Sequence, residues 1–214
     1  MSEFKLKYTD VVEESWNSFR DQLPLTAGLS LVFICGMAVL FYIPVFGHFL
    51  MSPFGLGYLK CLIQIRKKEK FDFPDFFWAF SNLNRFIHAT LLGFLIALGY
   101  LGFILLLVPG IWWFVVTTFS NVIFISGTED CIAAIKKSMQ MVEGRWWNVA
   151  GLIGFLSLIN LAGAMFFLIG VIISLPVTTL ALYIAFEKLL LNQLTHLQTE
   201  TLQSVSAEAP VPKA

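Results

Sequence analysis

The chain has 214 residues, of which 57% are hydrophobic and 13% charged, and its mean hydropathy is +0.78. This composition provides too little polar surface for a soluble globular domain, and a net charge of zero provides no basic excess for binding nucleic acid. We therefore expect an integral membrane protein without a nucleic-acid partner.

The charged residues are confined to a few segments of the chain. No Asp, Glu, Lys or Arg occurs in residues 22–59, 86–128 or 146–186. A helix needs roughly 20 residues to cross about 30 Å of hydrocarbon, so each uncharged run has room for two spans. The runs lack the alternation of barrel strands, and in lipid each backbone polar group must be paired within the protein. The predicted fold class is all-α, a polytopic integral membrane protein with six transmembrane helices.

Turn-forming residues lie near the middle of each uncharged run and divide it into a hairpin. They are Pro44 with Gly47, Pro109 with Gly110, and Gly170. The six spans then fall near residues 25–43, 48–65, 88–107, 111–127, 148–167 and 170–188. The second span is the weakest because it contains Pro53 and Lys60, and a re-entrant loop is the alternative. If it crosses, Lys60 is expected to extend its amine to the headgroups.

The basic residues predict the orientation of these spans. Lys and Arg occur before the first hairpin, between the hairpins and at the end of the last span, and none lies at the predicted hairpin tips. By the positive-inside rule both termini are cytoplasmic. A re-entrant second segment would place the basic residues 66–70 outside, against this bias.

An amphipathic helix is predicted on the cytoplasmic side before each hairpin, because apolar residues there recur at helical spacing. The three sets are Tyr8, Val11, Val12, Trp16 and Phe19; Phe73, Phe76, Phe77, Phe80 and Leu83; and Ile132, Ile135, Met139 and Val142. Thr128 is predicted to cap the third helix and Gly144 to end it. Such helices either lie in the lipid interface or pack under the bundle of spans. The unit of amphipathic helix and hairpin occurs three times, either as a true internal repeat or by convergence.

The end of the chain differs in composition from the rest. After Thr195 the sequence becomes polar and contains Pro210 and Pro212. We therefore expect residues 1–195 to form a single transmembrane domain and residues 196–214 to form a disordered cytoplasmic tail.

The candidate site consists of uncharged polar groups within the predicted spans. Asn121 and Asn160 carry amides at membrane depth, and Pro176 frees backbone in the last span. Such amides commonly hydrogen-bond between helices and serve packing. The alternative is a narrow polar site, as in transporters built from broken helices.

The sequence contains no residues that predict a catalytic centre, a metal site or a cofactor. The three histidines, His48, His88 and His196, are predicted at the outer face, at the inner face and in the tail, so they cannot share a metal within one chain. No Gly-rich phosphate loop or nucleophile elbow occurs. The three cysteines form no disulfide framework, and burial as small apolar side chains is expected: Cys35, Cys61 and Cys131.

The expected function is therefore non-enzymatic. The missing catalytic residues and the repeated interfacial helices favour an accessory or lipid-interacting component of the membrane. The alternative is a transporter or flippase for a small amphipathic substrate, favoured by the polar groups of Asn121, Asn160 and Pro176. The expected partners are membrane lipids, together with another membrane protein or a second copy of the chain.

Several motifs resemble those of a known family. They are IPVFGHFLMSPFGLG, FDFPDFFWAF, LLLVPGIWW and AIKKSMQMVEGRWW, followed by a late Pro176. From Pro44 to about Tyr183 the chain resembles a group of bacterial inner-membrane proteins of no settled activity. This group is related to the membrane domain attached to some glycerophosphoryl diester phosphodiesterases. The resemblance implies a six-span protein of the bacterial inner membrane, and it transfers no catalytic residues to this chain.

Overall fold

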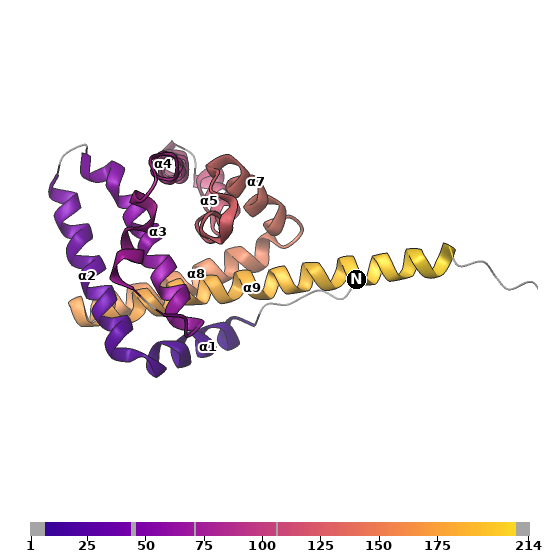
Figure 1. Cartoon of the computed structure of the whole chain (residues 1–214), viewed down its shortest axis with the longest axis horizontal. Helices are drawn as coiled ribbons and strands as arrows, with labels where there is room; N and C mark the ends of the chain where they lie inside the picture. Colours follow the sequence, from indigo (N-terminus) through magenta and orange to yellow (C-terminus); the bar gives the residue numbers. More distant parts are fainter. Residues whose placement is uncertain (1–6, 44–45, 71, 106, 209–214) are drawn as a thin grey trace, which may run out of the picture.

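The structure, a computed structural model, describes residues 7–43, 46–70, 72–105 and 107–208, and each regular element in them is a helix (Figure 1). The prediction of an all-α fold is confirmed. The elements are α1 (Tyr8–Asp21), α2 (Leu23–Tyr42), α3 (Phe46–Arg66), η1 (Phe73–Phe80), α4 (Leu83–Leu105), α5 (Leu107–Thr117), α6 (Ser120–Ile123), η2 (Phe124–Thr128), α7 (Cys131–Val142), α8 (Trp146–Met165) and α9 (Phe167–Glu208).

The described part of the chain contains four helical segments that are long and apolar enough to cross a membrane. They are Leu23–Tyr42, Val108–Thr128, Trp146–Met165 and Ile169–Thr199. These segments identify a membrane protein. The other two predicted spans coincide with α3 and α4. Helix α3 is less apolar because it contains Ser52, Lys60 and Gln64, and the apolar described part of α4, Leu83–Gly99, is shorter.

Consecutive long helices contact each other, α2 with α3, α4 with α5, and α8 with α9. Figure 1 shows that these pairs do not share one direction, because α2 and α3 run across the direction of α8 and α9 while α4 is seen nearly end-on. A core of buried side chains joins α1, α3, η1 and the helices from α4 to α9. The pairs therefore cross around a common core and do not stand parallel to one another.

The turn between α4 and α5 lies earlier than the sequence predicted. Helix α4 ends at Leu105 and α5 begins at Leu107, so Pro109 and Gly110 lie inside α5. Proline is tolerated there because the N–H groups of the first helical turn have no partner within the helix. Of the first predicted turn, Pro44 lies outside the described residues, and Gly47 lies inside α3, which begins at Phe46.

The turn between α8 and α9 is also earlier, because α8 ends at Met165 and α9 begins at Phe167. Gly170 was predicted at this turn, but it lies inside the first turns of α9. A Cβ at Gly170 would lie 2.0 Å from the carbonyl oxygen of Gly163 in α8. Glycine is therefore required here by the close approach of two backbones rather than by a turn.

The segment predicted as the second amphipathic helix is not an α-helix. Residues Phe73–Phe80 form the 3₁₀ helix η1, and Phe77 interrupts it with φ −99° and ψ 16°. Its buried residues are Phe76 and Ala79, which face α3. Short 3₁₀ segments of this kind are common as connectors.

The third predicted helix, α7, begins two residues later than expected. Asp130, not Thr128, is its N-cap, and the Asp130 Oδ1 accepts a hydrogen bond from the N–H of Ile132 at 3.0 Å. The chain reverses before it through Gly127 (φ 114°) and Glu129 (φ 44°), which removes Thr128 from the capping position. Gly144 follows the helix with φ 74°, a left-handed conformation that helix ends favour.

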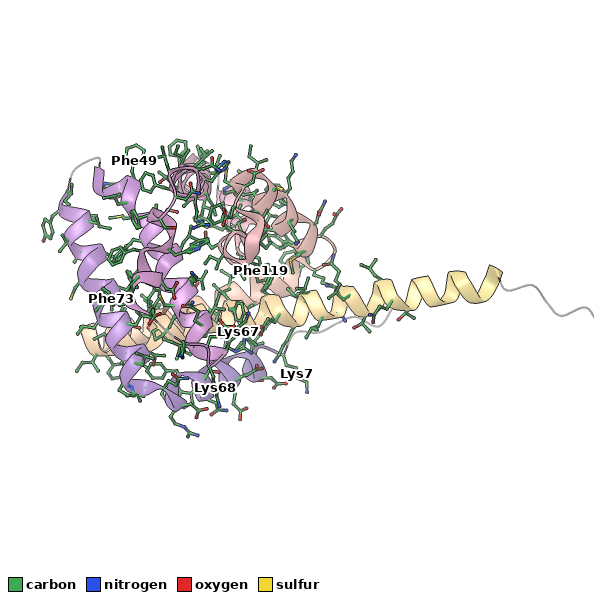
Figure 2. All side chains as sticks on the ribbon, in the orientation of Figure 1. Lys7, Phe49, Lys67, Lys68, Phe73 and Phe119 are labelled. Atoms are coloured by element: carbon green, nitrogen blue, oxygen red, sulfur yellow. The ribbon has the colours of Figure 1, made fainter. Side chains whose placement is uncertain are left out.

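The candidate span Val108–Thr128 is broken near its middle, between Thr117 and Ser120, and α7 folds back against the break. Ser138 of α7 is fully buried there. Its hydroxyl donates to the carbonyl of Val116 at 2.6 Å and accepts from the N–H of Phe119 at 3.2 Å. Figure 2 shows Phe119 among the side chains of these helices. Ser138 therefore supplies the hydrogen bonds that the broken helix lacks.

Replacing Ser138 with alanine is expected to lower the free energy of unfolding by about 1–2 kcal/mol, because the Val116 carbonyl and the Phe119 N–H lose their partner in a buried place. Ser15 provides a matched control, since it is also fully buried and its hydroxyl donates to the Val11 carbonyl of its own helix. Denaturant titration of the detergent-solubilised variants would compare them. Equal losses for Ser138→Ala and Ser15→Ala would contradict the role given to Ser138.

Helix α9 continues through the point where the tail was predicted to begin. It includes Thr195 and ends at Glu208, while residues 209–214 lie outside the described residues. Residues 196–208 are rich in Leu, Gln and Glu, which favour helix, and the first proline follows at Pro210. Figure 1 shows this part of α9 as an arm that extends beyond the other helices.

Candidate functional site

Two cavities meet between α4, α6 and α9. The α8 cavity has a volume of about 500 Å³ and is also bounded by α5 and α8. The α3 cavity has a volume of about 540 Å³ and is also bounded by α2 and α3. Both are lined by Ile96, Thr118, Asn121, Leu175, Thr179 and Leu182. The two cavities therefore lie on either side of one shared wall.

The structure brings both predicted asparagines to the α8 cavity. Asn121 lies in α6 and also lines the α3 cavity, and Asn160 projects from α8. The Asn160 Oδ1 accepts a hydrogen bond from the Thr178 hydroxyl at 3.2 Å, and that hydroxyl also lies 2.9 Å from the carbonyl oxygen of Ser174. Pro176 is buried in α9 and does not line either cavity, although its neighbours Leu175 and Thr178 line the α8 cavity.

One helix break and one missing helical hydrogen bond lie beside the cavities. The break between α5 and α6 places Asn121 directly after the turn, where its side chain faces both cavities. In α9, Pro176 has no N–H, so it cannot donate the helical hydrogen bond to the carbonyl of Ile172. Asn121 therefore stands at a helix break, whereas Asn160 lies within the regular helix α8 and contacts Thr178, two residues after Pro176.

The polar lining of the α8 cavity consists of hydroxyls and amides. It comprises Thr117, Thr118, Asn121, Ser157, Asn160, Ser174, Thr178 and Thr179. Neither of these two cavities is lined by Asp, Glu, Lys, Arg or His. Such a lining can exchange hydrogen bonds with an uncharged polar group, but it has no counter-charge for an ion. It also lacks a paired nucleophile and base.

The α3 cavity contains polar residues that the sequence did not single out. Ser52 and Tyr58 of α3 line it, and the Tyr58 hydroxyl lies 2.9 Å from that of Ser30. Gly55 and Gly93 also line this cavity with exposed backbone. Glycine and serine in neighbouring helices were the available signal, but in membranes they also mark simple close packing.

A network of ion pairs joins the end of α3 to the middle of α1 and of α9. The Arg66 guanidinium at the end of α3 contacts Glu14 of α1 at 2.8 Å and also contacts Glu187 of α9. Lys188 contacts the other oxygen of Glu14 at 2.9 Å. Glu187 and Lys188 are adjacent in sequence, and they connect α9 to α3 and α1.

Lys60 is paired within the protein. The sequence had instead predicted that its amine would extend to the lipid headgroups. Its Nζ contacts Asp75 of η1 at 2.9 Å and lies 5.1 Å from the centre of the Trp78 ring. The hydrogen bond from Lys60, assisted by one from Gln64, holds the pKa of Asp75 below its ordinary value. This pair anchors η1 to α3.

Comparison with known proteins finds no relative of this chain. None of the family models, curated proteins or solved structures compared with the chain matches it. The resemblance to the phosphodiesterase-associated membrane domain remains a prediction, and the candidate site rests on the cavities themselves.

Proposed function

We propose that this protein binds an amphipathic molecule with an uncharged polar headgroup in its two central cavities. It acts as a non-enzymatic accessory or lipid-interacting component of the bacterial inner membrane. The observation that carries the proposal is a cavity lined by hydroxyls and amides, with Asn121 and Asn160 facing it, between helices apolar enough to cross a membrane. Its partners are membrane lipids and another membrane protein or a second copy, not nucleic acid.

The charge of the ligand follows from the lining. A phosphate headgroup would need a basic side chain, because an unpaired charge at membrane depth costs several kcal/mol, on the order of 3 or more. A headgroup of hydroxyls can instead pair with Asn121 and Asn160, while its acyl chains meet apolar walls such as Leu156 and Leu182. A neutral glycolipid has these properties.

The binding test uses a photoreactive glycosyl diacylglycerol in vesicles that contain the purified full chain. We expect labelling of the wild-type protein and roughly tenfold weaker labelling of the variant carrying Asn121→Leu and Asn160→Leu, because two hydrogen-bonding groups are lost. Asn17→Leu is the control, because Asn17 is exposed on α1. Two results would contradict the proposal. One is equal labelling of the double asparagine variant and the Asn17→Leu control, and the other is stronger labelling of the wild-type protein by a photoreactive phosphatidylglycerol than by the glycolipid.

The proposed topology has six spans in three hairpins, each preceded by an amphipathic segment, with both termini cytoplasmic. The ion pairs of Arg66 support it, because they hold the end of α3 beside α1 and the charged pair of α9. Figure 2 shows Lys7, Lys67 and Lys68 toward the same edge as α1, and Phe49 at the opposite edge. A reporter fused after Lys68 is expected to be active in the cytoplasm. Activity on the outside would contradict six spans.

Transport is the second candidate function, favoured by the helix break before Asn121 and by Pro176 in α9 beside the cavities. Broken helices of this kind line substrate sites in transporters that alternate between two openings. Vesicles containing a fluorescent glycosyl diacylglycerol and an impermeant quencher would measure movement between leaflets. Faster movement with the wild-type protein, lost in the double asparagine variant, is the result that transport requires. Binding without faster movement would leave an accessory role.

A further inference from the structure

Three side chains that are common metal ligands meet where α4 passes the start of α7. His88 of α4, Asp130 and Cys131 each offer one ligand atom, and these atoms all lie within 4.8 Å of one another. The His88 Nδ1 lies 3.7 Å from the Asp130 Oδ1 and accepts a hydrogen bond from the backbone N–H of Cys131 at 3.5 Å. The cluster joins positions 43 apart in sequence, so it was not visible as a motif.

The backbone around the cluster is held in place by contacts outside it. Arg85 lies one turn before His88 on α4, and its guanidinium contacts Glu129 at 2.6 Å. The same guanidinium lies 4.3 Å from the centre of the Trp78 ring. These contacts fix the start of α7 against α4. The ligand positions are therefore set without the help of an ion, which lowers the cost of binding one.

The burial of the three ligands differs in a way that leaves a route for an ion. Cys131 is fully buried, whereas the side chains of His88 and Asp130 are 30% and 51% exposed. The His88 and Asp130 side chains therefore lie on the solvent side of the buried sulfur, where their movement would admit an ion. Asp130 uses Oδ1 to cap α7, which leaves Oδ2 for a metal.

We propose that His88, Asp130 and Cys131 bind a divalent, thiol-preferring cation such as Zn²⁺, with water in the fourth position. Imidazole nitrogen, carboxylate oxygen and thiolate sulfur are the three ligand types that zinc uses in proteins. Bonds of about 2.0–2.3 Å place tetrahedral ligands roughly 3.5 Å apart, so the cluster needs a contraction of about 1 Å. Small shifts of the partly exposed His88 and Asp130 side chains provide it, while Asp130 Oδ1 keeps its cap on α7. The three residues do not line either cavity, and the proposed site does not rest on the proposed function.

The test uses Co²⁺ as a spectroscopic probe for the purified, chelator-treated full chain in detergent. We expect one equivalent of Co²⁺ to produce a thiolate-to-cobalt charge-transfer band that Zn²⁺ abolishes. Cys131→Ser should remove the band. Asp130→Asn should weaken affinity by about tenfold or more while keeping the helix cap, because asparagine caps as well as aspartate. Cys35→Ser and Cys61→Ser are controls that should keep the band.

Three results would overturn the site. They are the absence of the band in the wild-type protein, its persistence in Cys131→Ser, and its loss in Cys35→Ser, which would assign it to the exposed thiol. If Cys131→Ser does not fold, His88→Gln and Asp130→Asn decide the matter. Wild-type affinity in both of these folded variants would also exclude the site.

Discussion

Replacing Arg66 with methionine is expected to lower the free energy of unfolding by about 2–3 kcal/mol, because Glu187 loses the guanidinium it contacts and Glu14 keeps only Lys188 as a cationic partner. The Arg66 side chain is 17% exposed, and its partners Glu14 and Glu187 are 43% and 35% exposed. Solvent therefore screens the pairs in part, and the expected loss is below that of a fully buried network. The guanidinium also lies 5.3 Å from the centre of the Tyr183 ring, a contact that methionine cannot replace electrostatically.

Two further variants separate this effect from a general loss of positive charge. Lys67→Met removes the same charge from the next, exposed position and is expected to change stability by less than about 0.5 kcal/mol. Arg66→Lys should recover only part of the loss, because one ammonium cannot span both carboxylates as the planar guanidinium does. Denaturant titration in detergent would measure all three variants. A Lys67→Met variant as unstable as Arg66→Met would contradict the network.

Gly57→Ala is expected to destabilise the protein by about 3 kcal/mol, because η1 lies directly on the backbone of α3. A Cβ at Gly57 would stand 1.8 Å from the carbonyl oxygen of Phe76. That oxygen belongs to the backbone and cannot rotate away. Moving η1 outward would also lengthen the contacts that Asp75 makes with Lys60 and Gln64, at 2.9 and 3.0 Å.

Gly55 lies on the same helix and supplies the matched control. A Cβ at Gly55 would meet no atom within 4 Å. Gly55→Ala should therefore be neutral, or more stable by up to about 1 kcal/mol, because alanine favours the helix. Thermal unfolding of the two variants in the same detergent provides the comparison. Equal midpoints would show that η1 does not rest on Gly57.

The fold-back of α7 connects the charged surface of the protein to its cavities. Ser138 of α7 hydrogen-bonds to the backbone at the helix break that positions Asn121. Cys131, at the start of α7, belongs to the proposed metal site. A cation bound at the start of α7 would therefore act on the same helix that supports the cavity wall. The segment between the second and third predicted hairpins is part of the core, not an external linker.

The sequence predicted the helices well because length and apolarity are local properties. The range predicted as 25–43 is α2, Leu23–Tyr42, and the range predicted as 148–167 is α8, Trp146–Met165. Prediction was poorer at the turns. Pro109 and Gly170 were predicted at turns, but both lie just inside helices. Proline fits the first turn of a helix, and Gly170 is needed because the backbone of α8 passes too close for a Cβ atom.

The amino-acid sequence by itself determined that this is a helical membrane protein with amides inside its predicted spans, because those features follow from composition and spacing along one chain. The tertiary structure alone decided that Asn121 and Asn160 face one cavity and that Ser138 hydrogen-bonds to the backbone of a broken helix. It also decided that His88 lies beside Cys131. These are contacts between residues far apart in sequence. They depend on how the helices cross, and periodicity within one helix carries no information about that crossing.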